Sequence, residues 1–436
     1  MTHAVLLLAA IFVAVPAEGA GRRELLDALV AEQQPAGGWV FAAPPGKRPQ
    51  PLTQVVGLAE RLAAPLGLAT WDLLVLRSPG TPAAALELLA GGVPERQEAY
   101  DAAARRAAHL LADVQLEPGG WFSEMPLHDG RPAWWFRQIA WRMTLDDDVT
   151  PGAIRALLAV WERTREESLR LAARRGLDLL HQAQLPDGAF PIVWRPPWLH
   201  RLHESQEDAP SLNDGATPLA IETLLEAARV FRDPRHLDAA SRAGDWLLSV
   251  QLGEPAPGWA QQYNAEVRPA PGRGFEPAAL ATWETRHAAE ALLALAEATR
   301  EVRYCQAAAR AVRWLARVSI ASGCWPRFVD LADGSPVYVG ADGMRVDGPE
   351  QARPGYSWTG EFGIPQLLAR LGLDAAGRRR GRPHPAPAPL PGDPGTCPGG
   401  GPHAPELEGP RLLAAAAARE RAVAQRGAEF CAAAFD

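Results

Sequence analysis

The chain has 436 residues, 47% of them hydrophobic, which is enough to bury a large core in one or two domains. Its formal net charge of −7 argues against a nucleic-acid-binding protein, which usually presents a basic face. Lys47 is the only lysine. GC-rich codon usage would explain this preference for arginine over lysine. Whatever its origin, nearly every basic contact must come from a planar guanidinium, which suits bidentate binding of carboxylates.

The chain begins with an apolar run, MTHAVLLLAAIFVAV, that is too short for a membrane span. Small residues around Ala17 suit cleavage after that position, although no lysine or arginine precedes the apolar run. We interpret residues 1–17 as a secretory signal rather than a helix of the mature fold. The protein is therefore expected to be secreted or periplasmic.

The four cysteines lack the CxxC spacing that is typical of a zinc site. They lie at positions 305, 324, 397 and 431. Export would permit disulfides, but the sequence does not define their pairing.

A helical segment, a glutamine, a glycine-aromatic turn and a second helical segment recur along the chain. The turns end at Trp39, Trp121, Phe190, Trp259 and Trp325. The last three steps between these aromatic residues are 69, 69 and 66 residues, whereas the first is 82. Because helix pairs that repeat at such a period form closed or open rings, the sequence predicts an all-α fold, an α/α toroid (incomplete α/α barrel) with short extended segments at one rim.

The second helices of two consecutive units also match in sequence. Residues 145–158 read LDDDVTPGAIRALL, and residues 212–225 read LNDGATPLAIETLL. The Thr-Pro in each predicts a helix start with Thr as the N-cap and Pro at the first helical position. We expect an irregular helical repeat over residues 18–104 and the toroid over 105–372. The Gly/Pro-rich stretch in 373–436 cannot bury a core and is expected to be disordered.

Acidic residues precede both of these helices. Asp146, Asp147 and Asp148 occupy the place that Asn213 and Asp214 occupy one repeat later, so both groups come to one rim. A single aspartate there is better explained as a helix cap. Three adjacent carboxylates exceed what a cap requires, and hard oxygen ligands from two loops suit calcium.

The stretch 258–277 is unlike any helix or core segment. It reads GWAQQYNAEVRPAPGRGFEP, in which three prolines stiffen the loop around Arg273. Stiff loops that present one polar side chain often bind ligands. On this evidence Arg273 is either a solvated turn arginine or a clamp for a carboxylate.

This block closely resembles the signature of the family-ten pectate lyases, which also run Trp-x-Ala-Gln-Tyr/His-Asp and then Arg-x-Tyr/Phe-Glu. Further segments match in the family's order: the two acidic motifs above, then 325–330 (WPRFVD), 340–343 (GADG) and 353–358 (RPGYSW). The resemblance covers roughly residues 105–372.

The resemblance implies a calcium-dependent lyase that cleaves polygalacturonate, or a related uronate polymer, by β-elimination. It implies that Arg273 is the base and that the reaction is favoured at alkaline pH. The implied calcium ligands are Asp146, Asp147 and Asp214. The implied substrate contacts are Arg353, Arg327, Arg345, Arg268, Tyr263 and Trp259. We expect a monomer whose partner is the acidic polysaccharide.

Several positions depart from the family pattern. Ala341 stands where the family has an arginine that holds uronate, and Asn264 stands where an aspartate is usual. Arg345, four residues on, is a candidate replacement. These departures leave open a non-catalytic relative that binds an acidic glycan. A terpenoid-cyclase-like toroid, which also uses Gly-x-Trp turns and an acidic run, is a further alternative that leaves the Arg273 block unexplained.

Overall fold

The computed structural model describes residues 21–39, 72–128, 131–132, 142–200, 206–321, 323–373 and 430–435. The expected signal, residues 1–17, and nearly all of the expected disordered tail lie outside the described residues. None of the helices in the described ranges has the length and apolar character of a membrane span.

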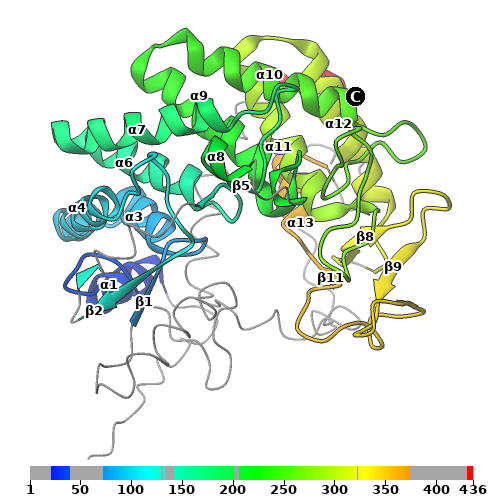
Figure 1. The fold of residues 1–436 in the computed structure, drawn as a ribbon, viewed down its shortest axis with the longest axis horizontal. Coiled ribbons are helices and arrows are strands. Elements are labelled where there is room, and N and C mark those ends of the chain that lie inside the picture. Colours follow the sequence, from blue (N-terminus) through cyan, green and yellow to red (C-terminus); the bar gives the residue numbers. More distant parts are fainter. Residues whose placement is uncertain are drawn as a thin grey trace, which may run out of the picture.

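Helical hairpins dominate the described chain and follow one another around an arc (Figure 1). The helices are α1 (Arg22–Glu32), α3 (Thr81–Ala90), α4 (Gln97–Asp113), α6 (Thr150–Thr164), α7 (Glu167–Ala183), α8 (Pro197–His200), α9 (Ala216–Phe231), α10 (Pro234–Val250), α11 (Thr282–Thr299), α12 (Val302–Arg317) and α13 (Ile364–Arg370). Short 3-10 turns are η2 (Pro94–Arg96), η3 (Gln206–Asp208), η4 (Asn213–Gly215) and η5 (Ala432–Phe435).

The helices form two layers. One member of each pair, α3, α6, α9 and α11, packs against the next in chain order, while α4, α7, α10 and α12 each pack on their own partner. The expected α/α toroid is confirmed. A regular pair, α3 with α4, begins in the segment assigned to an irregular N-terminal repeat, and α4 runs across the boundary that the sequence placed at residue 104.

Three helix-helix turns are built alike. An arginine follows the first helix in the left-handed conformation, with φ of 58° at Arg165, 54° at Arg232 and 61° at Arg300. Its N–H donates to a carbonyl four residues earlier and closes the helix. A left-handed residue reverses the chain within two or three residues, so the partner helix starts at once.

The glycine-aromatic turns lock successive repeats together. Each tryptophan of the turns at 39, 121, 259 and 325 is buried, and its indole N–H donates to a carbonyl near the end of the preceding helix at 2.7–2.9 Å. The backbone N–H of the turn's aromatic residue donates to a threonine hydroxyl in the next inner helix at 3.0–3.2 Å. Those threonines are Thr81, Thr150, Thr217 and Thr285.

This contact corrects the predicted N-caps. Thr150 lies inside α6, whose N-cap is Val149, and Thr217 lies inside α9, which begins at Ala216. Their hydroxyls instead accept hydrogen bonds from the buried backbone N–H groups of Trp121 and Phe190 in the preceding turns.

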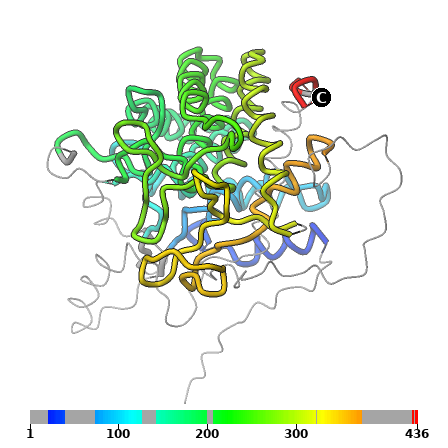
Figure 2. The backbone as a smooth tube through the Cα atoms, turned by 90° about the vertical axis from the view of Figure 1, so that its right-hand side faces the viewer, coloured from blue at the N-terminus to red at the C-terminus, as the bar shows by residue number. Residues whose placement is uncertain are grey.

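Short strands line one rim, as the sequence predicts. They are β1 (Asp72–Val75), β2 (Glu124–His128), β3 (Arg131–Pro132), β4 (Met143–Thr144), β5 (Val193–Trp194), β6 (Leu280–Ala281), β7 (Trp325–Pro326), β8 (Phe328–Val329), β9 (Pro336–Val339), β10 (Arg345–Val346) and β11 (Thr359–Gly360). They form four small antiparallel sheets, ordered β1-β2-β3, β10-β9-β8-β6, β11-β7 and β4-β5. The hairpin of β9 and β10 projects from the helices (Figure 2, gold).

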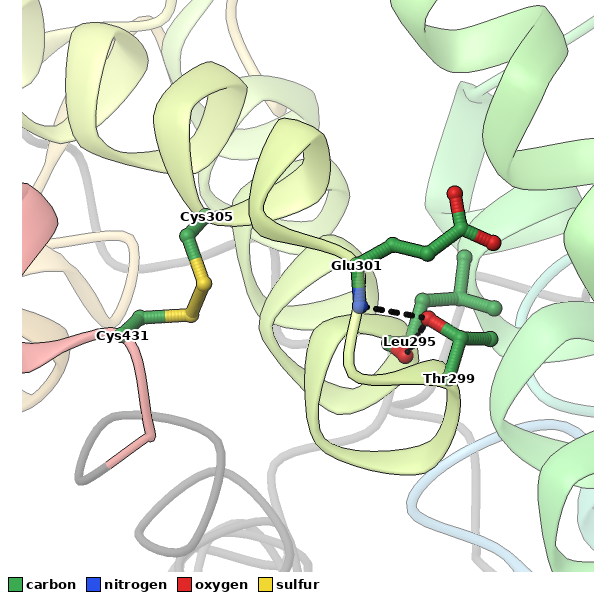
Figure 3. Close-up of a disulfide and its surroundings, with 5 residues drawn as sticks. All are labelled: Leu295, Thr299, Glu301, Cys305 and Cys431. Carbon is green, nitrogen blue, oxygen red and sulfur yellow. Dashed lines mark hydrogen bonds between the residues drawn. A yellow bond between two sulfur atoms is a disulfide. The ribbon is translucent and has the colours of Figure 1, made fainter.

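A disulfide fixes the segment 430–435 to the outer layer. Cys305 of α12 is bonded to Cys431 (Figure 3). The same segment accepts a hydrogen bond from Arg313 at the carbonyl of Ala434, 2.7 Å away, and places Phe430 under the Arg300 guanidinium. Although most of the tail lies outside the described residues, this end of it therefore belongs to the folded surface.

Candidate active site

Two consecutive rim loops bring the predicted carboxylates together. The N–H of Asp147 donates to the carbonyl of Asp214 at 2.9 Å. The side-chain amide of Asn213 donates to Asp214 Oδ2 at 2.8 Å and to Asp146 Oδ2 at 3.2 Å. Asp147 and Asp214 have positive φ, 53° and 44°, a conformation that aspartate tolerates better than most residues. The loops before α6 and α9 thus hold the carboxylates in a shared cluster.

The third residue of the acidic run has a different role. The carboxylate of Asp148 accepts hydrogen bonds from Arg155 of α6 at 2.7 and 2.5 Å. Arg155 also donates to Thr223 of α9 at 2.8 Å. Asp148 therefore ties two inner helices together, and the cluster comprises Asp146, Asp147 and Asp214.

The cluster is short of positive charge. Burial, followed by repulsion from Asp147 and Asp214, raises the pKa of Asp146 well above its usual value. Burial and the charge of Asp214 raise the pKa of Asp147 to about 7. Nearby guanidinium groups oppose both shifts without cancelling them. A carboxylate that is hard to ionise in this place would ionise more easily beside a cation.

The residues fit calcium only in part. Within the described ranges, no three His, Cys, Asp or Glu side chains converge closely enough to hold a metal ion. The cluster nevertheless offers hard carboxylate oxygens and negative charge that nearby arginines compensate only in part, which suits calcium better than a transition metal. A bound calcium would take the rest of its ligands from water and from an anionic substrate.

Arg273 lies on the proline-braced loop as predicted, and its side chain is 61% exposed. Its Nε and one Nη donate to Glu276 Oε1 at 3.0 and 2.5 Å, and its backbone N–H donates to Glu276 Oε2 at 2.9 Å. Partial burial would lower the pKa of Arg273, but these hydrogen bonds and the charge of Glu276 outweigh it and raise the pKa above its usual value. The arginine is preorganised as a charged donor.

Glu276 is itself held on several sides. It is buried and accepts hydrogen bonds at Oε1 from Gln261 at 3.2 Å and from the Tyr356 hydroxyl at 3.3 Å. Burial alone would raise its pKa, but the Arg273 contacts lower it below the usual value. Because Glu276 stays ionised and fixed, it sets the orientation of Arg273.

Arg327 is buried and connects this region to the acidic cluster. Its Nη2 lies 2.8 Å from Glu284 Oε1 and 3.6 Å from Asp214 Oδ1. Its guanidinium carbon also lies 4.5 Å from the centre of the Trp283 ring. In these positions Arg327 can balance the charge of Asp214 and support the cluster, whereas its burial leaves little of it for a polymer to touch.

Glu284, in the first turn of α11, is a site residue that the sequence analysis missed. Its side chain is fully buried, and burial raises its pKa to about 7 even though Arg327 lowers it. It is separated from Arg327 by 43 residues. The motif TWETRH that contains it looks like an ordinary helix start. The only signal in the sequence was an acidic residue close to, but not at, the position one repeat after Asp214.

The other predicted arginines differ in availability. Arg353 is exposed, and its guanidinium carbon lies 4.6 Å from the centre of the Phe275 ring. The guanidinium carbon of Arg273 lies 5.1 Å from the centre of the same ring. Arg345 donates to Asp330 at 2.7 Å and to Ser335 at 2.9 Å. Arg268 is exposed and forms a long ion pair with Glu266 at 3.8 Å. Arg353 is therefore the one placed beside Arg273, and Arg345 is already engaged.

Two predicted substrate contacts are core residues instead. Trp259 is fully buried, and its indole donates to the Leu247 carbonyl at 2.8 Å. Tyr263 is also fully buried and packs edge-on against Trp246 at 5.4 Å. The family motif predicted both as substrate contacts, but its aromatic residues pack in the core. Neither ring therefore offers a surface to a sugar.

The comparisons with known proteins agree with the resemblance read from the motifs. Residues 135–323 match the sequence model of the family described as pectic acid lyase. A family 10 polysaccharide lyase from Cellvibrio cellulosa superposes with a TM-score of 0.51 and 21% identity, over 69% of this chain and 99% of that chain.

A mutant of a family 10 polysaccharide lyase from the same organism, in complex with trigalacturonic acid, superposes with a TM-score of 0.50 and 20% identity, over 67% of this chain and 98% of that chain. No curated protein matches the sequence. At these identities the solved structures establish the fold alone. The resemblance is thus confirmed by a pectic acid lyase match over residues 135–323, on the fold of the family 10 polysaccharide lyases.

Proposed function

We propose that the protein is a calcium-dependent polysaccharide lyase that cleaves polygalacturonate, or a related uronate polymer, by β-elimination. The observation that carries the proposal is the arrangement at the rim. A largely buried acidic cluster lies within electrostatic reach of three arginines, Arg77, Arg273 and Arg327, on a chain whose residues 135–323 match the pectic acid lyases.

In this reaction a base removes the proton from C5 of a uronate. The electron pair of the C5–H bond forms the C4–C5 double bond, the C4–O glycosidic bond breaks, and the leaving oxygen takes a proton from solvent. We assign the base to Arg273. Because Glu276 raises its pKa, the neutral form is scarce at neutral pH, which supports an alkaline optimum.

Calcium would be held by Asp146, Asp147 and Asp214, and when bound it would polarise the uronate carboxylate and make the C5 proton more acidic. Around it, Asn213 fixes two of the three carboxylates by hydrogen bonds. Arg353, stacked on Phe275 beside Arg273, is placed to bind a uronate carboxylate.

A second candidate is a non-catalytic relative that binds an acidic glycan. Two observations favour it: Ala341 lacks the family's arginine, and Arg273 is held as a cation rather than as a base. The terpenoid-cyclase alternative fits poorly, because a polyprenyl substrate needs an apolar cavity and the residues around Asp214 are charged. Export and a monomeric state remain part of the proposal.

The test is the growth of ultraviolet absorbance from unsaturated product on polygalacturonate at alkaline pH, first with calcium and then with chelator. We expect a calcium-dependent rise that Arg273→Ala abolishes. Arg317→Ala, an exposed arginine of α12 paired only loosely with Glu254 at 3.6 Å, is the matched control and should keep the wild-type rate. Retained activity in Arg273→Ala would refute the assignment of the base. Oligogalacturonate binding without any product would favour the glycan-binding relative.

A further inference from the structure

The repeat register identifies a rim residue outside the segment that matches the lyase family. The threonines that receive the turn N–H groups, Thr81, Thr150 and Thr217, are equivalent positions in three consecutive repeats. Four residues before them stand Arg77, Asp146 and Asn213. The first repeat therefore presents a cation where the second and third present site residues.

The backbone confirms that this first loop lies beside the acidic cluster. The N–H of Ser78 donates to the carbonyl of Asp147 at 2.7 Å, which repeats the bond from Asp147 to Asp214 at 2.9 Å. The N–H of Arg77 donates to the carbonyl of Ser123 at 3.2 Å and anchors the loop from its other side. Three successive rim loops thus form one continuous row.

The side chain of Arg77 is held only loosely. It is 20% exposed, and its Nη2 lies 3.4 Å from Oε1 of Glu124, a carboxylate that is 1% exposed. Other buried glutamates at this rim have closer partners, at 2.5 Å for Glu276 and 2.8 Å for Glu284. Within the described residues, Nε of Arg77 and Oε2 of Glu124 have no hydrogen-bond partner. The unpartnered Nε is itself buried, so what an incoming anion could reach is the part of the side chain that remains exposed, which is held by one long ion pair.

We propose that Arg77 is a substrate-binding residue that pairs with a carboxylate of the acidic polysaccharide and extends the binding face by one repeat. The inference rests on the proposed function. Packed helices are about 8–10 Å apart, so a contact one repeat away reaches a different uronate from the one at the acidic cluster. A partly exposed guanidinium with only a 3.4 Å ion pair can turn toward that carboxylate and form a charge-assisted hydrogen bond with it.

The experiment is calorimetric binding of trigalacturonate and hexagalacturonate, with calcium, in an Arg273→Ala background that prevents turnover. We compare that parent with Arg77→Ala combined with Glu124→Gln, so that no buried carboxylate is left unpaired, and with Arg77→Lys. Arg105→Ala, an exposed arginine of α4 in the same repeat, is the matched control. Thermal unfolding of each variant reports on the fold.

We expect the Arg77→Ala combination to weaken hexagalacturonate binding by about tenfold and to leave trigalacturonate binding unchanged, with Arg77→Lys in between. Equal hexagalacturonate affinity in parent and variant would overturn the inference. An equal loss for both lengths would also overturn it, because it would indicate damage to the acidic cluster. A parent that binds neither oligomer would instead remove the proposed function on which the inference rests.

Discussion

Replacing Arg327 by methionine tests the arrangement of charges at the rim. The substitution keeps much of the side-chain volume under Trp283 but leaves Glu284, which is fully buried, without its 2.8 Å partner. Removing one member of a buried ion pair typically costs about 3–5 kcal/mol, because the remaining charge is not solvated. Asp214 loses a cation 3.6 Å away as well. We expect Arg327→Met to lower the free energy of unfolding by about 3 kcal/mol or more at pH 8.

The assay is urea unfolding followed by tryptophan fluorescence at pH 8 and pH 5. Because the pKa of Glu284 is about 7, its carboxylate is mostly ionised at pH 8 and mostly protonated at pH 5. The penalty of Arg327→Met should therefore be larger at pH 8. In Arg327→Met combined with Glu284→Gln most of the penalty should be recovered, with a coupling energy of roughly 1–3 kcal/mol. A penalty below about 1 kcal/mol at pH 8, or no coupling, would refute the buried ion pair.

Three further predictions concern the cluster, an outer pair of helices and the core. Asp147→Asn should raise the melting temperature in chelator, because it removes the repulsion between this carboxylate and its acidic neighbours. Calorimetry should show weaker calcium binding by the same variant. A lower melting temperature in chelator would contradict the charge argument. Burial and the neighbouring His181 lower the pKa of His236 to about 4, below its usual 6.5, so the unfolded chain takes up the proton first as pH falls. The free energy of unfolding should drop between pH 6.5 and 4 by on the order of 1–3 kcal/mol in wild type and by less in His236→Phe. The same drop in both proteins, measured by urea unfolding, would contradict a role for His236. Trp121→Ala should lower the free energy of unfolding in urea by about 3–5 kcal/mol. The substitution empties a fully buried site and removes the hydrogen bond to the Leu111 carbonyl. An unchanged free energy of unfolding would mean that the turn does not lock the repeats.

The local pattern of the sequence determined the architecture of this protein. The recurring glycine-aromatic turn between helical segments and the steps of 69, 69 and 66 residues predict an α/α toroid, because each is a property of neighbouring residues or of a fixed period. Equivalent positions in consecutive repeats come to the same rim, so the meeting of Asp146 and Asp214 also followed from the sequence.

The tertiary structure decided which side chains are available. Trp259 and Tyr263 belong to the same motif as Arg273, yet packing between helices buries both and leaves the arginine exposed. The pairing of Glu284 with Arg327 and the approach of Ser78 to Asp147 join residues that are distant in the chain. Such contacts depend on how whole helices pack against one another. A motif describes the spacing of residues along one segment, so it does not specify which side chain of a neighbouring repeat will contact them.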